Sequence, residues 1–338
     1  NNSIRKKEMK RTFIGKRIIA TLIIAVMTAL PVLTYTIIVN ADNAADAHES
    51  KSGGAYAATG QTSNVGYSTT LYDASNGMSS SDAMCVMSAS DGRIWVGSYS
   101  GVMVYDGNTF DKLDVADGYT NGRAIFEDSK KRIWVGTNDN GVLIIDGDET
   151  THLTYQEGLP SSSIRAFAED SEGNIIVGTS AGMCYVSSDK GVHSIADTRI
   201  DKKRIAPLYA DASGKVYGLT GDGAVLCVDN KAVTGLYEAT DLGMNKISTI
   251  AVDPNTNGSL YIGTDGGQIY HGAFGAKADQ MQVINTGLDS IYCINYCCDR
   301  LWVASETQIG YIDETGAFQL INNLPINSGM EMMVDDYQ

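Results

Sequence analysis

The chain alternates between short apolar runs and short polar stretches, and one apolar phrase returns at nearly constant intervals. Its clearest copies are residues 94–98 (IWVGS), 133–137 (IWVGT) and 175–179 (IIVGT), with degenerate copies at 216–220, 260–264 and 301–305. The steps between the fourth residues of successive copies are 39, 42, 41, 44 and 41 residues. A repeat of this length that contains only strand-like segments predicts the blades of a β-propeller.

The third unit shows what one repeat contains. Residues 163–170 have apolar alternation, and the turn signal Ser-Glu-Gly-Asn follows at 171–174. Two further short strands, at 175–179 and 183–186, and a last one at 191–195 complete the unit. Loops of this kind between β-branched and aromatic runs favour a meander of four antiparallel strands. Such units cannot bury both faces alone, and a radial arrangement covers them.

Several residues recur in register, and we interpret them as structural. Large rings share one position of the repeated strand, namely Trp95, Trp134, Trp302, Tyr217 and Tyr261. Glycines lie two positions further on, at Gly97, Gly136, Gly178 and Gly263. A large ring beside a residue without a side chain suits sheets packed face to face. One acid also repeats, at Asp128, Asp170, Asp211, Asp253 and Asp335, which is typical of a turn cap.

The repeats resemble the regulator-propeller repeats of bacterial one- and two-component sensors. The best match begins at Gly158-Leu159-Pro160, continues through Asp170 and Gly173, and ends at Gly182. Units four and six depart from the pattern, since Leu219 and Ala304 replace the glycine. The resemblance implies the extracytoplasmic input domain of a membrane signalling protein. It also implies a cytoplasmic output that this chain does not contain, a histidine kinase or a diguanylate cyclase, and a homodimer through the full-length protein.

The N-terminal segment predicts export. Residues 1–17 carry a charge of about +6, and residues 18–39 form an uncharged apolar run that is long enough to span a bilayer. The positive charges predict that residues 1–17 are cytoplasmic and that everything after the run is outside. Two interpretations stay open, a transmembrane signal anchor and a cleaved signal peptide. Residues 40–65 are polar and small, which indicates a flexible spacer before the propeller.

The ends of the repeat region bear on ring closure. Six complete units fill residues 82–320, and residues 330–336 open a seventh. The strand 67–73 matches the outermost strand of a unit, so we expect it to complete the last blade. Residues 66–338 are therefore predicted to form an all-β propeller of four-stranded antiparallel blades, six complete and a seventh truncated at its C-terminal end. One N-terminal transmembrane or signal helix is expected to precede it.

The net charge of the whole chain is −15, and the exported part carries about −21. An acidic domain repels phosphates, which argues against a nucleic-acid partner. One basic cluster contrasts with this charge, at Arg199, Lys202, Lys203 and Arg204. It is either an ordinary solvated loop or a site for an anionic group such as a uronic acid.

The six cysteines fall into two groups. Cys85, Cys184 and Cys227 lie singly in predicted strands and are expected to be buried. Cys293, Cys297 and Cys298 cluster in the sixth unit, the last two where other units have the acidic turn. Their spacing is not that of a zinc site, so no metal is predicted. Outside the cytoplasm a disulfide is allowed, and its connectivity stays open.

The polar residues favour ligand binding over catalysis. The four histidines are scattered, and neither a catalytic constellation nor a cofactor site is predicted. Propeller ligands usually bind at loops around one mouth of the channel. We expect a small extracellular molecule or glycan fragment to contact residues there, namely Tyr99, Tyr119, Arg123, Asn138, Asp139, Arg165, Lys203 and Arg204. The alternatives are a secreted binding or scaffold propeller and a lyase- or glycosidase-type propeller enzyme.

Overall fold

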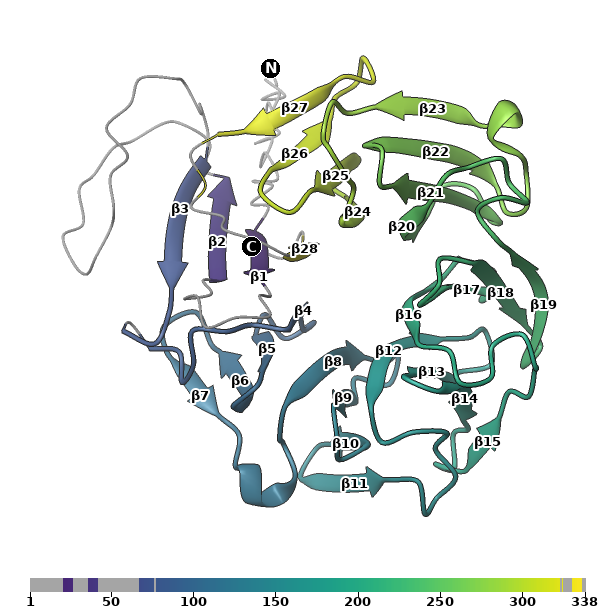
Figure 1. The fold of residues 1–338 in the computed structure, drawn as a ribbon. Helices are drawn as coiled ribbons and strands as arrows, with labels where there is room; N and C mark the ends of the chain where they lie inside the picture. The colour runs from purple at the N-terminus through teal and green to yellow at the C-terminus, as the bar shows by residue number, and fades with distance from the viewer. Residues whose placement is uncertain are drawn as a thin grey trace, which may run out of the picture.

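The computed structural model describes residues 21–26, 36–41, 67–75, 77–322, 324 and 330–335, and these residues form an all-β propeller. Six blades are arranged around a central axis (Figure 1), and each consists of four strands that follow one another along the chain. Neighbouring strands within a blade pair antiparallel. The six complete four-stranded blades predicted from the repeat are confirmed.

The first three blades contain the clearest copies of the repeat. Blade 1 consists of β4 (Cys85–Ser88), β5 (Ile94–Ser98), β6 (Gly101–Tyr105) and β7 (Phe110–Lys112). Blade 2 consists of β8 (Gly122–Glu127), β9 (Ile133–Thr137), β10 (Val142–Asp146) and β11 (Glu149–Leu153). Blade 3 consists of β12 (Ile164–Glu169), β13 (Ile175–Thr179), β14 (Gly182–Val186) and β15 (Val192–Ser194). A short 3-10 helix, Val115–Asp117, lies between blades 1 and 2.

The next three blades carry the degenerate copies and keep the same order. Blade 4 consists of β16 (Ile205–Ala210), β17 (Val216–Thr220), β18 (Val225–Asp229) and β19 (Ala232–Tyr237). Blade 5 consists of β20 (Ile247–Val252), β21 (Ser259–Thr264), β22 (Gln268–Ala273) and β23 (Gln282–Asn285), with a 3-10 helix at Ala278–Gln280. Blade 6 consists of β24 (Cys293–Cys297), β25 (Arg300–Ala304), β26 (Ile309–Ile312) and β27 (Phe318–Ile321).

A seventh sheet joins the two ends of the described chain. Its strand order is β28 (Met330–Asp335), β1 (Thr21–Val26), β2 (Thr36–Ala41) and β3 (Tyr67–Tyr72). The strands β1 and β2 fall where the sequence predicted one helix over residues 18–39. Both are rich in Thr, Ile and Val, whose branched side chains suit a strand as well as an apolar span. The rest of that run lies outside the described residues, which contain no helix of the length and hydropathy needed to cross a membrane.

Neighbouring blades pack face to face, as the repeated rings and glycines predicted. Trp134 of blade 2 is 1% exposed, and its ring centroid lies 6.1 Å from that of Phe167 in blade 3. A Cβ atom at Gly136 would lie 2.5 Å from a methyl carbon of Ile164 in the next blade. Glycine is therefore required at position 136, where the second strand of blade 2 meets the first strand of blade 3.

Hydrogen bonds to glutamate side chains also connect one blade to the next at one face of the ring. Ser90 in the first turn of blade 1 donates through its backbone N–H and hydroxyl to the Glu127 carboxylate of blade 2, at 2.6 and 2.5 Å. Ser129 of blade 2 makes the same pair of bonds to Glu169 of blade 3, at 2.7 and 2.6 Å. Equivalent residues one repeat apart thus form equivalent contacts, which fixes the rotation between blades.

The first strands of the blades surround the central channel. Each of these inner strands contacts the inner strand of the next blade, from β4 through β8, β12, β16, β20 and β24 to β28 and back to β4. Because the blades repeat by rotation, the inner strands all run in one direction along the channel. One mouth of the channel is therefore formed where inner strands begin, and the other where they end.

Candidate functional site

The mouth at which inner strands begin is built by one recurring backbone contact. In four blades the turn between the second and third strands donates an N–H to the residues that precede the inner strand. The donor–acceptor pairs are Asn138–Asn121 at 3.0 Å, Ser180–Ser163 at 2.9 Å, Gly221–Arg204 at 2.7 Å and Asp265–Lys246 at 3.2 Å. The loops that precede the inner strands and the turns between second and third strands therefore lie side by side at this mouth.

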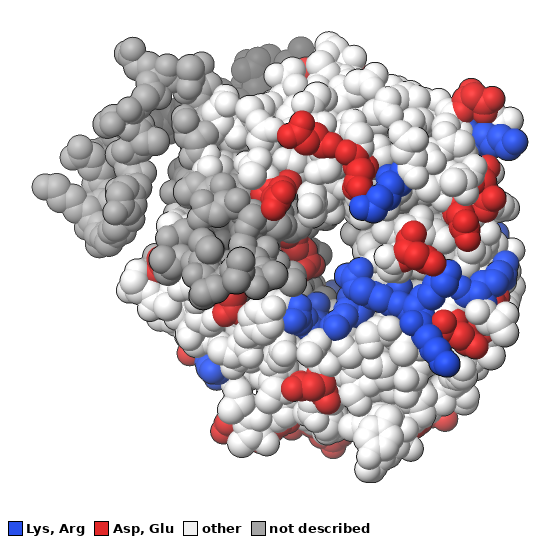
Figure 2. Space-filling view, in the orientation of Figure 1, with Lys and Arg blue, Asp and Glu red and all other residues white. Residues whose placement is uncertain are grey.

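Three arginines from consecutive blades converge at this mouth, which we call the arginine mouth. Arg123 is the second residue of β8, Arg165 is the second residue of β12, and Arg204 directly precedes β16. Figure 2 shows Lys and Arg side chains gathered beside the central opening on this face. The positive charge is thus focused on one part of an acidic molecule.

β-Bulges present two of these arginines to the channel. The register between β8 and β9 shifts between Gly122 and Ala124, so Arg123 has no residue opposite it. The register between β12 and β13 shifts in the same way around Arg165. A bulged residue is released from the ladder and its side chain is redirected, which is why bulges are common beside functional sites.

The three guanidinium groups repel one another. The pKa of Arg165 is lowered, first by desolvation and then by the charges of Arg123 and Arg204. The pKa of Arg204 is lowered by desolvation and by the charge of Arg123. Holding like charges together in a partly desolvated place costs free energy, which a bound anion would offset.

The arginines have few partners of their own. Arg165 donates to the Asn138 side-chain oxygen at 2.9 Å and to the Ile164 carbonyl at 3.1 Å. The guanidinium of Arg123 lies 4.9 Å from the ring centroid of Tyr99. Among the described residues, no carboxylate lies within salt-bridge distance of the three arginines, and the Arg204 guanidinium makes no hydrogen bond. Their capacity to bind a carboxylate, sulfate or phosphate in bidentate fashion is therefore largely unused.

Besides the acids of the loops, one acid lies on an inner strand at this mouth. Glu331, near the start of β28, is exposed to water and lies close enough to Arg204 for their charges to interact. Desolvation raises the pKa of its carboxyl group to about 8, against the opposing effect of the Arg204 charge. With this raised pKa, the carboxyl group neutralises the arginines only in part at neutral pH.

The other predicted ligand residues are distributed unevenly. The exposed Tyr99, the Arg165 partner Asn138, and Asp139, whose carboxylate accepts from Thr120 at 3.2 Å, lie in loops of the arginine mouth. Lys203 is already paired with Asp222 at 2.6 Å. The last predicted residue, Tyr119, does not lie at the mouth.

Tyr119 lies in the core between blades 1 and 2 and not at the mouth. Its ring is 7% exposed and its hydroxyl group bonds that of Thr150 at 3.2 Å. The basic cluster seen in the sequence is also used unevenly. Arg199 is paired with Asp197 at 2.6 Å and Lys203 with Asp222, whereas Lys202 and Arg204 have no ion pair with a described residue.

Sequence reasoning missed two residues of this mouth besides Glu331. Tyr292 is 47% exposed and directly precedes β24, the position that Arg204 has before β16. Lys246 directly precedes β20 and is paired with Asp265 at 2.6 Å. The signal that could have found both is their register, since each is the last residue before an inner strand.

The opposite ends of the inner strands carry the repeated aspartates. Asp128, Asp170, Asp211 and Asp253 are turn caps as predicted, and the side chain of Asp335 lies outside the described residues. The Asp128 carboxylate accepts from the N–H groups of Lys130 and Arg132, from the Arg132 guanidinium at 2.6 Å and from the Trp134 indole at 2.8 Å. Asp170 and Asp211 accept from their own turns in the same way. No group of three or more potential metal ligands occurs among the described residues.

Comparison with known families confirms the resemblance seen in the repeats. The model of the two component regulator propeller matches residues 117–139 and 158–181. Each stretch runs from the loop before an inner strand into the repeated second strand, in blades 2 and 3. None of the curated proteins matches the chain.

Solved structures share the fold. The extracellular domain of BT4673 from B. thetaiotaomicron, named in two structures as a one component and as a hybrid two component system, is 18% and 13% identical over 76% and 84% of this chain, with TM-scores of 0.59 and 0.60. The chain spans 39% of the length of either BT4673 structure. A streptogramin B lyase is 13% identical, with a TM-score of 0.59 over 72% of this chain and 83% of its own. At these identities the likeness shows the propeller fold alone.

Proposed function

We propose that this propeller is the ligand-binding input domain of an extracytoplasmic sensor and that it recognises an anionic ligand at the arginine mouth. The observation that carries the proposal is the convergence of Arg123, Arg165 and Arg204 with no carboxylate in salt-bridge distance among the described residues. The match to the two component regulator propeller supports the sensor role. The extracellular origin of the BT4673 domain fits a propeller outside the membrane.

The ligand that fits best is an acidic saccharide fragment. Guanidinium groups bind carboxylates and sulfates with two parallel hydrogen bonds. The exposed rings of Tyr99 and Tyr292 offer flat faces of the kind that stack on sugars, and one of them already supports Arg123. The acidic remainder of the molecule repels anions, which restricts their binding to this mouth.

Attachment to the membrane is the second part of the proposal. In a membrane sensor, residues 18–39 cross the bilayer, and they cannot at the same time supply β1 and β2 to the seventh sheet. Fractionation of cells that express the chain distinguishes the two placements. Propeller that stays in the membrane after an alkaline carbonate wash supports the anchor, whereas release of the chain with its N-terminus intact supports a secreted binding propeller.

Calorimetric titration of the full chain tests the anionic ligand. The probes are tetragalacturonate, a neutral tetrasaccharide of galactose, and inorganic sulfate as a free anion. We expect the acidic tetrasaccharide to bind and the neutral one to bind far more weakly. Arg165→Met should weaken binding by about 10- to 100-fold, because hydrogen bonds to charged groups contribute about 1.5–3 kcal/mol.

A matched control distinguishes a specific effect at the arginine mouth from the loss of one positive charge elsewhere on the protein. Arg93→Met removes the same charge from a turn at the other end of an inner strand, where Arg93 is paired with Asp91 at 2.6 Å. This variant should keep the affinity of the wild-type chain. Equal affinity for the acidic and neutral tetrasaccharides, or equal losses in the two variants, would contradict recognition at the arginine mouth.

A further inference from the structure

The first turn of blade 6 differs from the turns of the other blades. Blades 2, 3 and 4 use an aspartate-capped turn, whereas β24 and β25 are joined by the two residues Cys298 and Asp299, with Cys297 opposite Arg300. Both central residues have positive φ, +55° and +57°. Such a turn prefers Asn-Gly, and neither residue here is glycine.

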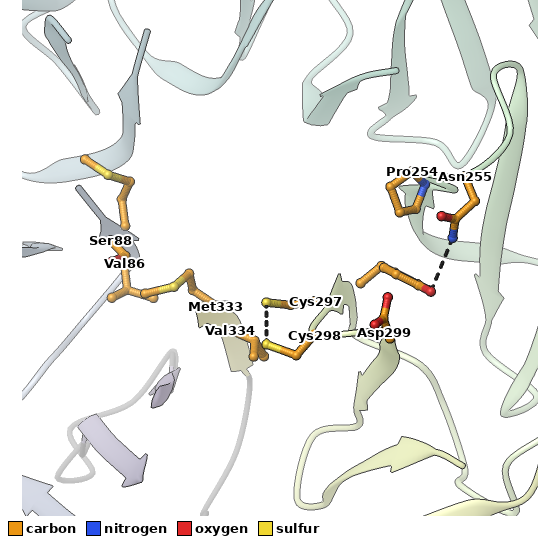
Figure 3. A pocket seen from close by; sticks show the side chains of 11 residues that line it. Val86, Ser88, Pro254, Asn255, Cys297, Cys298, Asp299, Met333 and Val334 are labelled. Carbon is orange, nitrogen blue, oxygen red and sulfur yellow. Dashed lines mark hydrogen bonds between the residues drawn. The ribbon is translucent and has the colours of Figure 1, made fainter. Parts of the chain in front are cut away.

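The turn brings two adjacent thiols together at the wall of a cavity. The sulfur atoms of Cys297 and Cys298 lie 3.2 Å apart. The cavity measures about 670 Å³ and is lined by residues where inner strands end, which places it at the mouth opposite the arginines. Figure 3 shows the side chains that line it. Val334 of β28 lies beside the thiols, and Pro254 and Asn255 face them across the cavity.

These two thiols are accessible, in contrast to the cysteines of the core. Cys85 and Cys184 are 2% and 0% exposed, and burial raises the pKa of both thiols. Cys297 and Cys298 are half-buried and border the open cavity. A soluble oxidant can therefore reach the pair but not the buried cysteines.

The third cysteine of the cluster is too far away to compete. Cys293 begins β24 and Cys297 ends it, so four residues at about 3.3 Å each place them roughly 13 Å apart along the strand. The Cys293 sulfur lies instead 3.6 Å from the carbonyl oxygen of Met332. Cys293 is therefore the natural control for the adjacent pair.

We propose that Cys297 and Cys298 form a reversible oxidation site that closes to a vicinal disulfide by exchange with a small-molecule or protein disulfide. One thiol loses its proton and attacks the incoming disulfide, and one thiolate leaves. The second cysteine, also deprotonated, then attacks the mixed disulfide and expels the other thiolate. Two protein thiols are oxidised, the incoming disulfide is reduced to two thiols, and the protein gains one S–S bond.

This disulfide would be a reversible, regulatory bond and not a structural bond that stabilises the fold. Adjacent Cα atoms are about 3.8 Å apart, shorter than the separation of about 4.4–6.8 Å found in ordinary disulfides. A strained disulfide is reduced more easily than a structural one. The covalent ring that this disulfide closes contains only Cys297 and Cys298. Its formation would therefore change the structure locally, at the wall of the cavity. The proposal is independent of the anion site at the other mouth.

Thiol counting on the full chain tests the site. Reduced protein is incubated with oxidised glutathione, quenched in acid, unfolded and alkylated with iodoacetamide before mass spectrometry. Alkylated thiols should fall from six to four in the wild-type chain. Cys293→Ser should lose the same two thiols, and Cys298→Ser and Cys297→Ser should lose none to an internal bond. Dithiothreitol should restore all of them.

Three results would overturn the proposal. The first is retention of all six thiols in the folded chain under conditions in which the urea-unfolded chain is oxidised. The second is a stable glutathione adduct on Cys297 or Cys298 without loss of the partner thiol. The third is a bond to Cys293, which the Cys293→Ser variant would abolish. Circular dichroism of each variant shows that the fold is kept, and the two serine variants check each other.

Discussion

The two mouths of the channel are formed by the same inner strands, yet their polar groups are used in opposite ways. Where the strands end in blade 2, Asp128 accepts four hydrogen bonds and is fully paired. Where the strands begin, Arg204 makes no hydrogen bond or ion pair through its guanidinium with any described residue. A polar residue that repeats in register and is fully paired stabilises the fold. Charges that converge from different blades and keep unused capacity point to recognition.

Blade 6 is an exception within this comparison. Its turn lies at the mouth of paired aspartates, but it carries Cys297 and Cys298 and no aspartate cap. The indole N–H of Trp302 donates to the Cys297 carbonyl at 3.3 Å, where the equivalent Trp134 donates to a carboxylate. In blade 6 a backbone carbonyl thus replaces the aspartate as acceptor for the indole. The side chains of this turn are therefore not needed to cap it and can serve in thiol chemistry.

The largest effect is expected from breaking the pairing at the aspartate end. In Asp128→Ala, the buried Arg132 guanidinium and the Trp134 indole lose their acceptor. Removing one partner of a buried ion pair costs about 3–5 kcal/mol, because the other charge stays buried. Urea denaturation at neutral pH should show a loss of this size in the free energy of unfolding.

An exposed turn provides the control for this variant. Asp106 accepts from the N–H groups of Asn108 and Thr109 at 2.8 and 2.7 Å in the outer hairpin of blade 1. Asp106→Ala should cost much less stability than Asp128→Ala, since water replaces the lost bonds. If both variants lose the same free energy of unfolding, then the buried partners of Asp128 contribute no more stability than the hydrogen bonds of an exposed turn.

The sequence was sufficient for the fold because the fold is repeated. One strand phrase at a fixed period specified the blades, and the register of Gly136 and Trp134 specified how blades pack. The cap role of Asp128 followed from its recurrence as well. Local patterns of this kind agree with the tertiary structure, so each copy strengthens the prediction.

The site was predictable only in part, for a physical reason. Arg123 and Arg165 could be assigned to one mouth, but their convergence with Arg204 depends on bulges and on the closed ring. Tyr119 was placed at the mouth because it lies in a loop, yet its apolar ring is buried between blades. Glu331 was missed, because nothing in its sequence neighbourhood reveals which charges lie across the channel.

The second prediction changes the charge of the arginine mouth through pH. Glu331 is mainly protonated below about pH 8 and ionises above it. Its negative charge would then compete with an anionic ligand beside Arg204 and lower the affinity on the order of tenfold by about pH 9. In Glu331→Gln, the affinity for tetragalacturonate measured by calorimetry should stay constant over this range.

The same group has a signature in stability. Its folded pKa lies above the ordinary value of 4.5, so the folded chain holds a proton that the unfolded chain releases. The free energy of unfolding should therefore decrease as pH rises from about 4.5 to 8, and less steeply in Glu331→Gln. Glu306→Gln, in an exposed turn of blade 6, should behave as wild type. Identical pH profiles of the free energy of unfolding for all three chains would rule out the raised pKa of Glu331.

The smallest effect is expected from completing the pairing in blade 1. Ala89 occupies the position of Asp128, with the same backbone bonds across its turn, and it is 1% exposed. The indole nitrogen of Trp95 is consequently buried without a hydrogen-bond partner among the described residues. Ala89→Asp supplies the acceptor that blade 2 already has, and the net gain of one such bond is about 1 kcal/mol.

The gain can be attributed to the indole by a double-mutant cycle. Ala89→Asp should raise the midpoint of urea denaturation in the wild-type chain and lower it in a Trp95→Phe background, where the new carboxylate has no indole N–H to accept. Opposite signs in the two backgrounds would show that the aspartate stabilises a blade by pairing with the ring across its turn. A loss of stability in both would mean that blade 1 has packed around alanine, and that the caps of blades 1 and 2 are not interchangeable.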